Sequence, residues 1–269
     1  RAVWNALVEL ESLLDAAARR TTMRENVDLD GHDEVFLGNG VLQAVIRDDG
    51  LGSIHEFDAF GLRHNFGDTL VRRVEHYYRK IRDGAAPNHG GEGIASAHDR
   101  VNFRHPVTAD DLLADALPRS LFLDRIDDRA VRYALQHHDR ARVVLGGPEI
   151  RKTFSVEANR LIVDYELGQA HSGAALEIEI NLAMPSCDGF MGRYVLDGGV
   201  PGGFGAAFTW ENSRAIALED GVLGGRLTLA ADRPLQIRAA PHHTVSQSED
   251  GFEKIMQAVT LRLRLPATA

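Results

Sequence analysis

The pattern of apolar and polar positions begins with one helical segment. Residues 2–20 place large apolar side chains at helical spacing and end on Arg19 and Arg20, where cations suit the negative end of a helix. This pattern predicts an amphipathic helix whose apolar stripe docks on a surface, and that surface need not lie within this chain. The stripe consists of Val3, Trp4, Leu7, Leu10, Leu13 and Leu14.

Short strands replace the helical pattern from residue 34 onward. The stretch EVFLGNGVLQAVIRDDGLGSIHEFDAF alternates apolar and polar positions between glycine turns, which predicts successive antiparallel strands. Similar runs return from residue 119 to the end of the chain. They are RSLFLDRI, ARVVLG, EIRKTFSVE, RLIVDYELG, ALEIEINLAM, GAAFTW, RAIALED, RLTLAAD, LQIRAA and AVTLRLRLP. The fold class is therefore predicted as mainly β, a large antiparallel sandwich preceded by an amphipathic helix.

Residues 243–257, HTVSQSEDGFEKIMQ, predict a short helix before the last strand. Ser246 can cap the free N–H groups of a first turn, and Glu249, three residues on, completes a capping box. The apolar residues that follow at helical spacing favour one or two amphipathic turns over a strand. They are Phe252, Ile255 and Met256. Gln247 and Glu249 are also candidates for direct contact with a ligand.

Residues 82–118 form a long excursion between strands, rich in Gly, His, Asp and Pro, with a brief helical patch around TADDLLADAL. Compact folds usually keep such a long excursion only for function. No flexible linker divides the strand region that surrounds it. The predicted division is therefore a helix at 1–24 and a sandwich at 25–269.

Composition excludes several classes of function. The chain has 39 acidic and 30 basic residues and a net charge of −9, which argues against sequence-independent binding to nucleic acid. Cys187 is the single cysteine, so no internal disulfide or cysteine zinc cluster forms, and a reducing cytoplasm fits. The sequence lacks an apolar stretch of about 18 residues and a basic-then-apolar leader pattern, so it predicts neither a membrane span nor secretion.

Two glutamates on one predicted strand are the first candidates for chemistry. Glu177 and Glu179 point to the same face of the strand, roughly 6–7 Å apart by strand rise. Retaining glycosidases use two carboxyl groups about 5–5.5 Å apart. A solvated strand face is the commoner explanation for such a pair and is favoured here. Asn181 extends the same polar stripe, which could instead bind sugar hydroxyls.

The run RRVEHYY, residues 72–78, mixes arginines, a carboxylate, an imidazole and aromatic rings, as sugar sites do. The alternative is a helix or strand end with a surface Arg–Glu pair of little energy. Trp210 is a further candidate, although a single Trp in a β protein is more often part of the core. The sugar-contact candidates from this run are Arg72, Arg73, Glu75, His76 and Tyr77.

Twelve histidines raise the question of a metal site. In a strand, the adjacent pairs 137–138 and 242–243 point to opposite faces, so the members of each pair cannot easily bind one ion. The chain has no HExxH or similar zinc pattern, although the His and carboxylate groups of the excursion could meet through folding. The sequence leaves metal binding open and predicts no cofactor.

Several blocks in fixed order resemble the C-terminal half of glycoside hydrolase family 57 enzymes of the 4-α-glucanotransferase and α-amylase type. The first helix, RAVWNALVELESLLD, is similar to the helix by which those enzymes leave their catalytic barrel. The resemblance spans essentially the whole chain. The other blocks are GSIHEFDAFGLRHNFGDTLVRRVEHYYRKI, GEGIASAHD, LFLDRI, EIEINLAMPS and the pair TVSQSEDGF and QAVTLRLRLP.

This resemblance implies a galactose-mutarotase-like supersandwich whose preceding helix packs on a catalytic (β/α) barrel. The two catalytic carboxylates of the family belong to that barrel and have no matching positions here, so this chain alone is not expected to cleave glycosidic bonds. The expected partners are that barrel and an α-glucan or maltooligosaccharide. A first residue, Arg1, within a helical pattern fits a piece of a longer protein.

Two other functions compete with this expectation. A stand-alone mutarotase-like aldose epimerase would use a histidine and a carboxylate as acid and base, with His76, His242 and Glu179 as the suppliers. A plain sugar-binding module would expose aromatic rings along one face. Aromatic residues make up only 7% of the chain, which disfavours an extended aromatic platform.

Overall fold

The protein folds into two antiparallel β-sheets of very different size. The computed structural model describes residues 6–10, 12–13, 24–67, 69–82, 106–148, 150–168, 175–187, 189–248 and 251–265. Within these residues the larger sheet has twelve strands and the smaller has four. The prediction of a mainly β, antiparallel fold is therefore confirmed.

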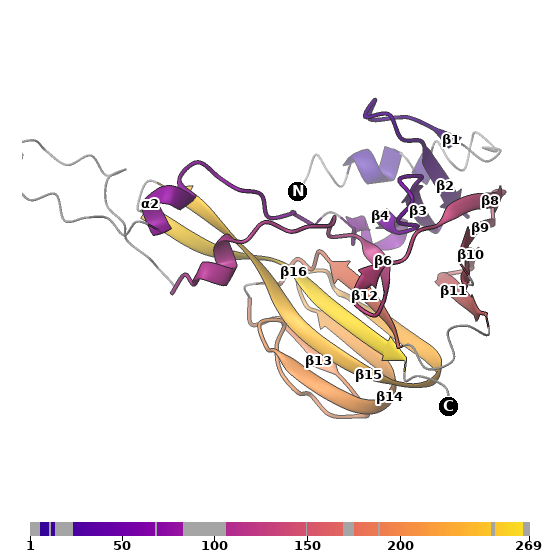
Figure 1. Cartoon of the computed structure of the whole chain (residues 1–269). Helices are drawn as coiled ribbons and strands as arrows, with labels where there is room; N and C mark the ends of the chain where they lie inside the picture. The colour runs from indigo at the N-terminus through magenta and orange to yellow at the C-terminus, as the bar shows by residue number, and fades with distance from the viewer. Residues whose placement is uncertain are drawn as a thin grey trace, which may run out of the picture.

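The larger sheet runs in the order β1-β2-β3-β4-β6-β12-β16-β15-β14-β13, with β5 beside β4 and β7 beside β6. Its first half contains β1 (Arg24–Glu25), β2 (Glu34–Gly38), β3 (Leu42–Arg47), β4 (Ile54–Ala59), β5 (His64–Asn65), β6 (Leu121–Ile126) and β7 (Arg129–Ala130). Its second half contains β12 (Leu176–Leu182), β13 (Gly192–Val195), β14 (Phe208–Asp220), β15 (Gly225–Ser248) and β16 (Gly251–Leu265). The long strands β15 and β16 extend beyond the rest of the sheet (Figure 1).

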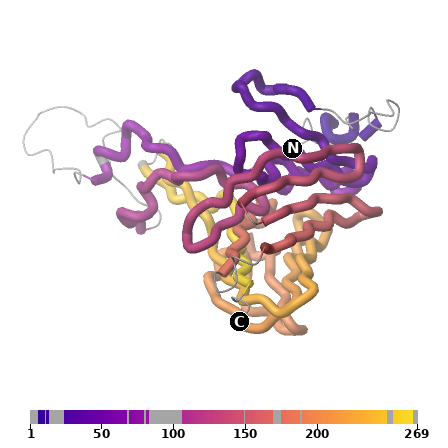
Figure 2. Tube along the Cα trace, turned by 45° about the vertical axis from the view of Figure 1, so that its right-hand side comes forward, coloured from indigo at the N-terminus to yellow at the C-terminus, as the bar shows by residue number. Residues whose placement is uncertain are grey.

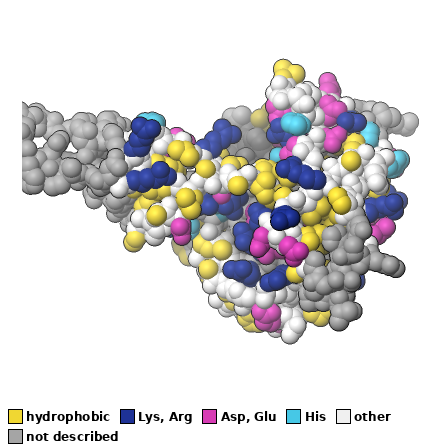
Figure 3. Space-filling model, in the orientation of Figure 1, with side chains coloured by type: hydrophobic (Ala, Val, Ile, Leu, Met, Phe, Trp, Pro, Cys, Tyr) yellow, Lys and Arg dark blue, Asp and Glu magenta, His cyan; other side chains and the backbone are white. Residues whose placement is uncertain are grey.

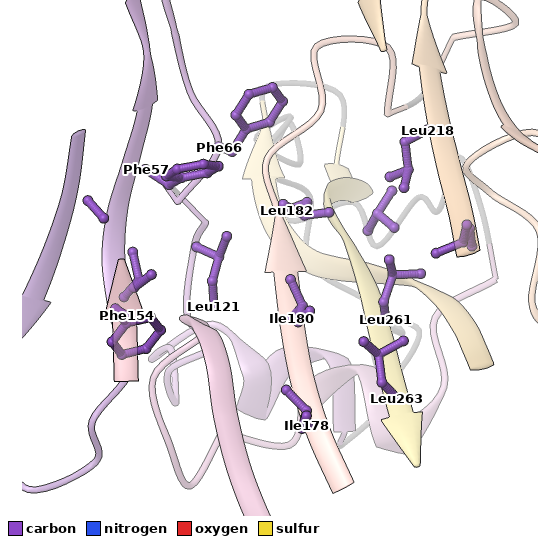
Figure 4. Close-up of a cluster of buried hydrophobic side chains, with 14 of the residues drawn as sticks. Phe57, Phe66, Leu121, Phe154, Ile178, Ile180, Leu182, Leu218, Leu261 and Leu263 are labelled. Carbon is purple, nitrogen blue, oxygen red and sulfur yellow. The ribbon is translucent and has the colours of Figure 1, made fainter. Parts of the chain in front are cut away.

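The smaller sheet covers part of the larger one and has the order β11-β10-β9-β8. It consists of β8 (Ala134–His138), β9 (Arg142–Gly147), β10 (Ile150–Glu157) and β11 (Arg160–Leu167). One apolar core includes side chains of both sheets. In Figure 4, Phe154 of the smaller sheet lies beside Leu121, while leucines and isoleucines of β12 and β16 continue the core.

A buried ion pair also connects the two sheets. Lys152 of β10 is fully buried, and its Nζ lies 2.7 Å from Oδ2 of Asp124 on β6. The hydroxyl groups of Tyr133 and Tyr165 donate to the two oxygens of the same carboxylate, each at 2.8 Å. Burial lowers the pKa of Lys152, and the charge and hydrogen bond of Asp124 oppose this shift. The pair satisfies charges that would be very costly to bury alone.

The N-terminal segment is helical at residues 6–10 and 12–13, in agreement with the predicted helix. Val8 is buried, whereas Leu7, Leu10 and Leu13 of the predicted stripe are exposed. The rest of the segment lies outside the described residues. Among the helices of the described residues, none has the length and apolar character needed to cross a membrane.

The structure merges strands that the sequence analysis separated. The runs GAAFTW and RAIALED both contribute to β14, and RLTLAAD and LQIRAA both belong to β15. Between them the pairing shifts, so that Ser213 lies opposite Leu235 and Ala215 opposite Ala230. Asn212 has a left-handed φ of 58° at this irregularity. The polar residues that resembled turns are therefore accommodated as bulges within continuous strands.

The short helix predicted over residues 243–257 is wrong. These residues belong to β15 and β16, where Ser246 pairs with Glu253 and Gln247 with Phe252. Val245 and Phe252 also pack against Tyr78. Cross-strand hydrogen bonds and distant packing thus override the local capping pattern. Glu249, the other half of the predicted capping box, lies outside the described residues.

The far ends of β15 and β16 form an arm that projects from the sandwich (Figure 2). We define the arm as residues 242–248 and 251–258 together with residues 69–82 and 106–118. It includes α2 (Tyr78–Arg82) and the 3-10 turn η3 (Ala109–Leu112), while a second turn, η1 (Phe60–Leu62), lies in the body. The predicted helical patch around TADDLLADAL is thus a single 3-10 turn, and residues 83–105 of the excursion lie outside the described residues.

The Lys152–Asp124 pair generates a stability prediction. Lys152→Met leaves the Asp124 charge buried without a cation, so we expect the free energy of unfolding to fall by about 3–5 kcal/mol in denaturant titrations. Adding Asp124→Asn to this variant removes the buried charge, so the double variant should recover part of the lost free energy of unfolding. The neighbouring surface pair Arg151–Glu166 provides the control, and Arg151→Met is expected to cost less than about 1 kcal/mol. Equal losses for Lys152→Met and Arg151→Met would contradict this role.

Candidate functional site

A network of charged and polar side chains covers one face of the larger sheet. On β12, Ile178 and Ile180 point into the core, and the alternate residues Glu179 and Asn181 point to the opposite face. Glu179 lies opposite Arg262 of β16 in the strand register. Figure 3 shows Lys/Arg and Asp/Glu side chains gathered on the visible face of the body. This network brings together several of the sequence-predicted site residues.

Glu179 is the centre of the first half of the network. Its Oε2 lies 2.8 Å from Nη1 of Arg125 and 3.1 Å from Nη2 of Arg262, and its Oε1 lies 3.8 Å from Nη1 of Arg119. The Nδ2 group of Asn181 donates to Oε1 at 3.0 Å. Burial favours a raised pKa for Glu179, but the Asn181 hydrogen bond and the three arginines outweigh it and lower the pKa.

The solvated strand face favoured from sequence is wrong for Glu179, which is only 3% exposed. Its neighbour Glu177 is half-buried and shares two of the same cations, with Oε1 at 4.0 Å from Arg125 and 3.8 Å from Arg262. A glycosidase acid must hold a proton near neutral pH, which requires a raised pKa. An environment that lowers the pKa of Glu179 therefore does not suit that residue to act as the acid.

Asp115 is the centre of the second half of the network. It accepts hydrogen bonds from the backbone N–H of Arg72 at 2.8 Å and from Nη2 of Arg72 at 3.0 Å. Nη2 of Arg119 donates to the same carboxylate, so Arg119 bridges Asp115 and Glu179. Burial opposes ionisation, but these hydrogen bonds hold the pKa of Asp115 well below its ordinary value. Arg72 therefore pairs with Asp115, outside the RRVEHYY run.

His242 completes the network beside Asp115. Its Nε2 donates to the carbonyl oxygen of Leu70 at 2.8 Å and lies 3.9 Å from Oδ2 of Asp115. Burial, and after it the positive charge of Arg119, lowers the pKa of His242 from 6.5 to about 4. The imidazole is therefore neutral at neutral pH and serves as a hydrogen-bond donor to the segment that enters the arm.

Asn181 is fully buried, and its amide is already occupied within the protein. Besides Glu179, its Nδ2 donates to the carbonyl of Ser120 at 3.1 Å, and its Oδ1 accepts from the Thr260 hydroxyl at 2.7 Å. In this structure the Asn181 amide therefore connects neighbouring strands. Contact of Glu179 or Asn181 with a sugar stays a prediction.

The other candidates of the RRVEHYY run lie on the arm. Arg73 and His76 are exposed, and Glu75 is half-buried. The Tyr77 hydroxyl donates to the carbonyl of Val245 at 2.9 Å, and burial raises its pKa to about 12. Its ring packs on Phe252 with centroids 5.8 Å apart, which makes Tyr77 part of the packing of the arm. Gln247 is half-buried near the tip of β15, and Glu249 lies outside the described residues.

Trp210 lies on β14, half-buried against the core. Its Nε1 donates to Oδ2 of Asp197 at 2.9 Å, and the Ser213 hydroxyl donates to Oδ1 of the same carboxylate at 3.1 Å. No hydrogen bond or ion pair between described residues joins Trp210 to the Glu179 network. The structure thus does not place all the sugar-contact candidates in one site.

Three carboxylates near the N-terminus lie close enough to share a cation. Oxygens of Asp28, Asp30 and Glu34 lie within 4.8 Å of one another. Arg47 pairs with Asp30, and Glu34 accepts the backbone N–H of Val27 at 2.8 Å. These partners already account for two of the carboxylates. The adjacent histidines 137–138 and 242–243 contribute to no group of metal-ligating residues in the described part of the chain.

Most of the arginines of this network, and the acid Asp115, were not predicted from the sequence. The residues of the network that the sequence did suggest are Glu177, Glu179, Asn181, Arg72 and His242. The paired register of β12 with β6 and β16 predicts which arginines face Glu179 once the strand order is known. The missed residues are Asp115, Arg119, Arg125, Thr260 and Arg262.

The lowered pKa of His242 generates a prediction about pH. The unfolded chain takes up this proton below pH 6.5, whereas the folded protein does so only near pH 4. The free energy of unfolding therefore falls between pH 6.5 and pH 4, by about 2–3 kcal/mol from this group. His242→Gln should flatten this dependence in denaturant titrations at pH 7 and pH 4.5. The exposed His137→Gln is the control, and an unchanged slope in His242→Gln would refute the assignment.

The sequence and the fold of this chain are similar to those of known proteins. The 4-alpha-glucanotransferase of Thermococcus kodakarensis is 25% identical over 280 residues, which cover 99% of this chain and 41% of the relative. The alpha-amylase of Pyrococcus abyssi is 24% identical over 290 residues, with the same shares. The crystal structure of the 4-alpha-glucanotransferase from Thermococcus litoralis has a TM-score of 0.70 at 20% identity, covering 99% of this chain and 40% of that chain. The last likeness shows a shared fold.

The chain thus spans about two fifths of the length of these relatives. A family model described as alpha-amylase/4-alpha-glucanotransferase, C-terminal, matches residues 26–144 and 139–269. These two ranges together include all strands from β2 to β16. The resemblance drawn from the sequence blocks is confirmed at this level, and the chain belongs to the alpha-amylase/4-alpha-glucanotransferase C-terminal family.

Proposed function

We propose that this chain is the accessory β-sandwich domain of an α-glucan-processing enzyme, in which it borders and supports an active site carried by a separate catalytic domain. The observation that carries this proposal is the environment of Glu179. Three arginines and Asn181 hold this carboxylate in the ionised state and occupy both of its oxygens. Such a carboxylate suits a structural role better than acid–base chemistry.

The exposed leucines of the N-terminal helix are evidence that the chain docks on a further domain. Val8 is 2% exposed, and Glu9 pairs with Arg63 of the body at 3.2 Å, so the helix is attached to the sandwich. Its leucines at 7, 10 and 13 are nevertheless between 47% and 64% exposed. A stripe of exposed leucines on an attached helix is typical of a surface that another protein domain covers.

The finer parts of the proposal come from the sequence blocks. They make the parent enzyme a member of glycoside hydrolase family 57, with a (β/α) barrel as its catalytic domain and a mutarotase-like sandwich here. The substrate is then an α-glucan or maltooligosaccharide. The relatives named as 4-alpha-glucanotransferase and alpha-amylase support this class of substrate. The single cysteine, half-buried Cys187, fits a cytoplasmic enzyme.

A stand-alone aldose epimerase finds less support. Its chemistry requires a histidine and a carboxylate that face one sugar. His242 is occupied by the Leu70 carbonyl, Glu179 is paired with arginines, and His76 lies exposed on the arm. These three residues therefore do not form an acid–base pair in this structure.

The proposal predicts that this chain alone is catalytically inactive. Incubated with maltooligosaccharides, it should change neither their chain lengths nor the rate at which their anomers equilibrate. Among the described candidates, Glu177 and Glu179 are paired with arginines and His242 with a backbone carbonyl, so none is poised for either reaction. Proton NMR follows both quantities in one experiment.

Either activity would contradict the proposal. Fast anomer exchange would make the chain an epimerase. Redistribution of chain lengths that is lost in Glu179→Gln but kept in Glu166→Gln, a change at an exposed position of β11, would make Glu179 catalytic. The wild-type chain heated until unfolded serves as the blank.

A further inference from the structure

The arm is a projection with a small apolar core of its own. Tyr78, Leu112, Val245 and Phe252 are buried together, and they join α2 and η3 to the ends of β15 and β16. Also within the arm, Nζ of Lys254 lies 2.7 Å from Oδ1 of Asp111. Of the described residues of the arm, Met256 alone belongs to the main apolar cluster of the sandwich, and the four buried residues form a separate cluster. The arm is thus an extension of the fold that is packed by its own side chains.

The orientation of the arm is fixed at its base. Arg72 and Arg119 both bind the carboxylate of Asp115, and His242 of β15 holds the carbonyl of Leu70. The backbone N–H of Asp115 also donates to the carbonyl of Arg72 at 3.0 Å, so the two segments that enter the arm lie side by side. Directional bonds between charged groups hold the arm at one angle to the sheet.

The outer surface of the arm is apolar where these two segments meet. Leu70, Val74 and Leu113 are between 55% and 69% exposed. They flank the pairing of Arg72 with Asp115 in sequence. Figure 3 shows hydrophobic side chains continuing along the arm toward the body. An apolar strip on a fixed projection typically marks a contact with another protein surface.

Positive charge borders this strip. Arg73 and Arg79 are exposed, and among the described residues neither forms an ion pair with a carboxylate. These two arginines place positive charge at the surface of the arm, in a chain whose net charge is −9. A partner surface with an apolar centre and acidic groups around it would complement both features.

We propose that the arm docks on the catalytic domain of the same enzyme, with its apolar strip in the centre of the contact and Arg73 and Arg79 at the edge. This inference rests on the function proposed above. About three fifths of the length of the relatives lies outside the part that matches this chain, which provides the partner.

Hydrogen–deuterium exchange tests the proposal, with this chain alone compared with the full-length polypeptide that contains it. We expect amides of residues 69–77 and 112–117 to exchange about tenfold more slowly in the full-length protein. Val74→Asp and Arg79→Glu, both at exposed positions, should remove this protection. Val200→Asp, at an exposed position next to β13 in the body, is the matched control and should leave it unchanged. Thermal melting of each variant chain checks that it folds.

The other outcomes separate the two proposals. Unchanged exchange in the arm, with protection confined to the helical residues 6–10 and 12–13, would overturn docking through the arm and leave the accessory-domain function standing. Absence of protection in both places would overturn both proposals. Arm protection that grows with the concentration of this chain alone would identify a second copy as the partner and would also overturn the inference.

Discussion

The position of the smaller sheet on the larger one depends on the buried ion pair of Lys152 and Asp124. Apolar contacts between sheets are non-directional and would tolerate several relative positions of the smaller sheet. The Lys152 ammonium group, by contrast, donates to Asp124 and to the carbonyls of Gly52 and Phe122. We interpret this set of directional bonds as the feature that fixes one position of β10 over β6. The apolar core then packs around that position.

The sequence predicted those features of the fold that depend on local alternation. Runs such as EIRKTFSVE and RLIVDYELG became β10 and β11 because their apolar residues face one side at period two. The helix predicted for residues 243–257 was wrong because their conformation depends on pairing across the hairpin, where Thr244 pairs with Ile255. The strand β13 was also missed, since its four residues pair only through β14 and short bridges. Local patterns carry no information about such partners.

In the candidate site, the polar residues of β12 were predictable from the sequence, but most of the arginines that pair with them were not. A carboxylate two residues from another on a strand is visible in the sequence, and Glu179 with Asn181 was found in this way. Whether such a carboxylate is solvated depends on its neighbours. Arg125 and Arg262 come from strands far away in the chain, and Arg119 enters from the segment that leaves the arm. Burial of Glu179 could therefore be inferred only after the order β6-β12-β16 was known.

The network is best explained by its place at the junction of the body and the arm. Its Glu179 half connects β6, β12 and β16 within the sheet, while its Asp115 half holds the segments that form the arm. Arg119 belongs to both halves. Strands β15 and β16 both continue from the central sheet into the arm, and their pairing shifts register between His242 and His243, at the base of the arm. The contacts of these charged residues thus connect the central strands of the sheet to the segments that enter and leave the arm.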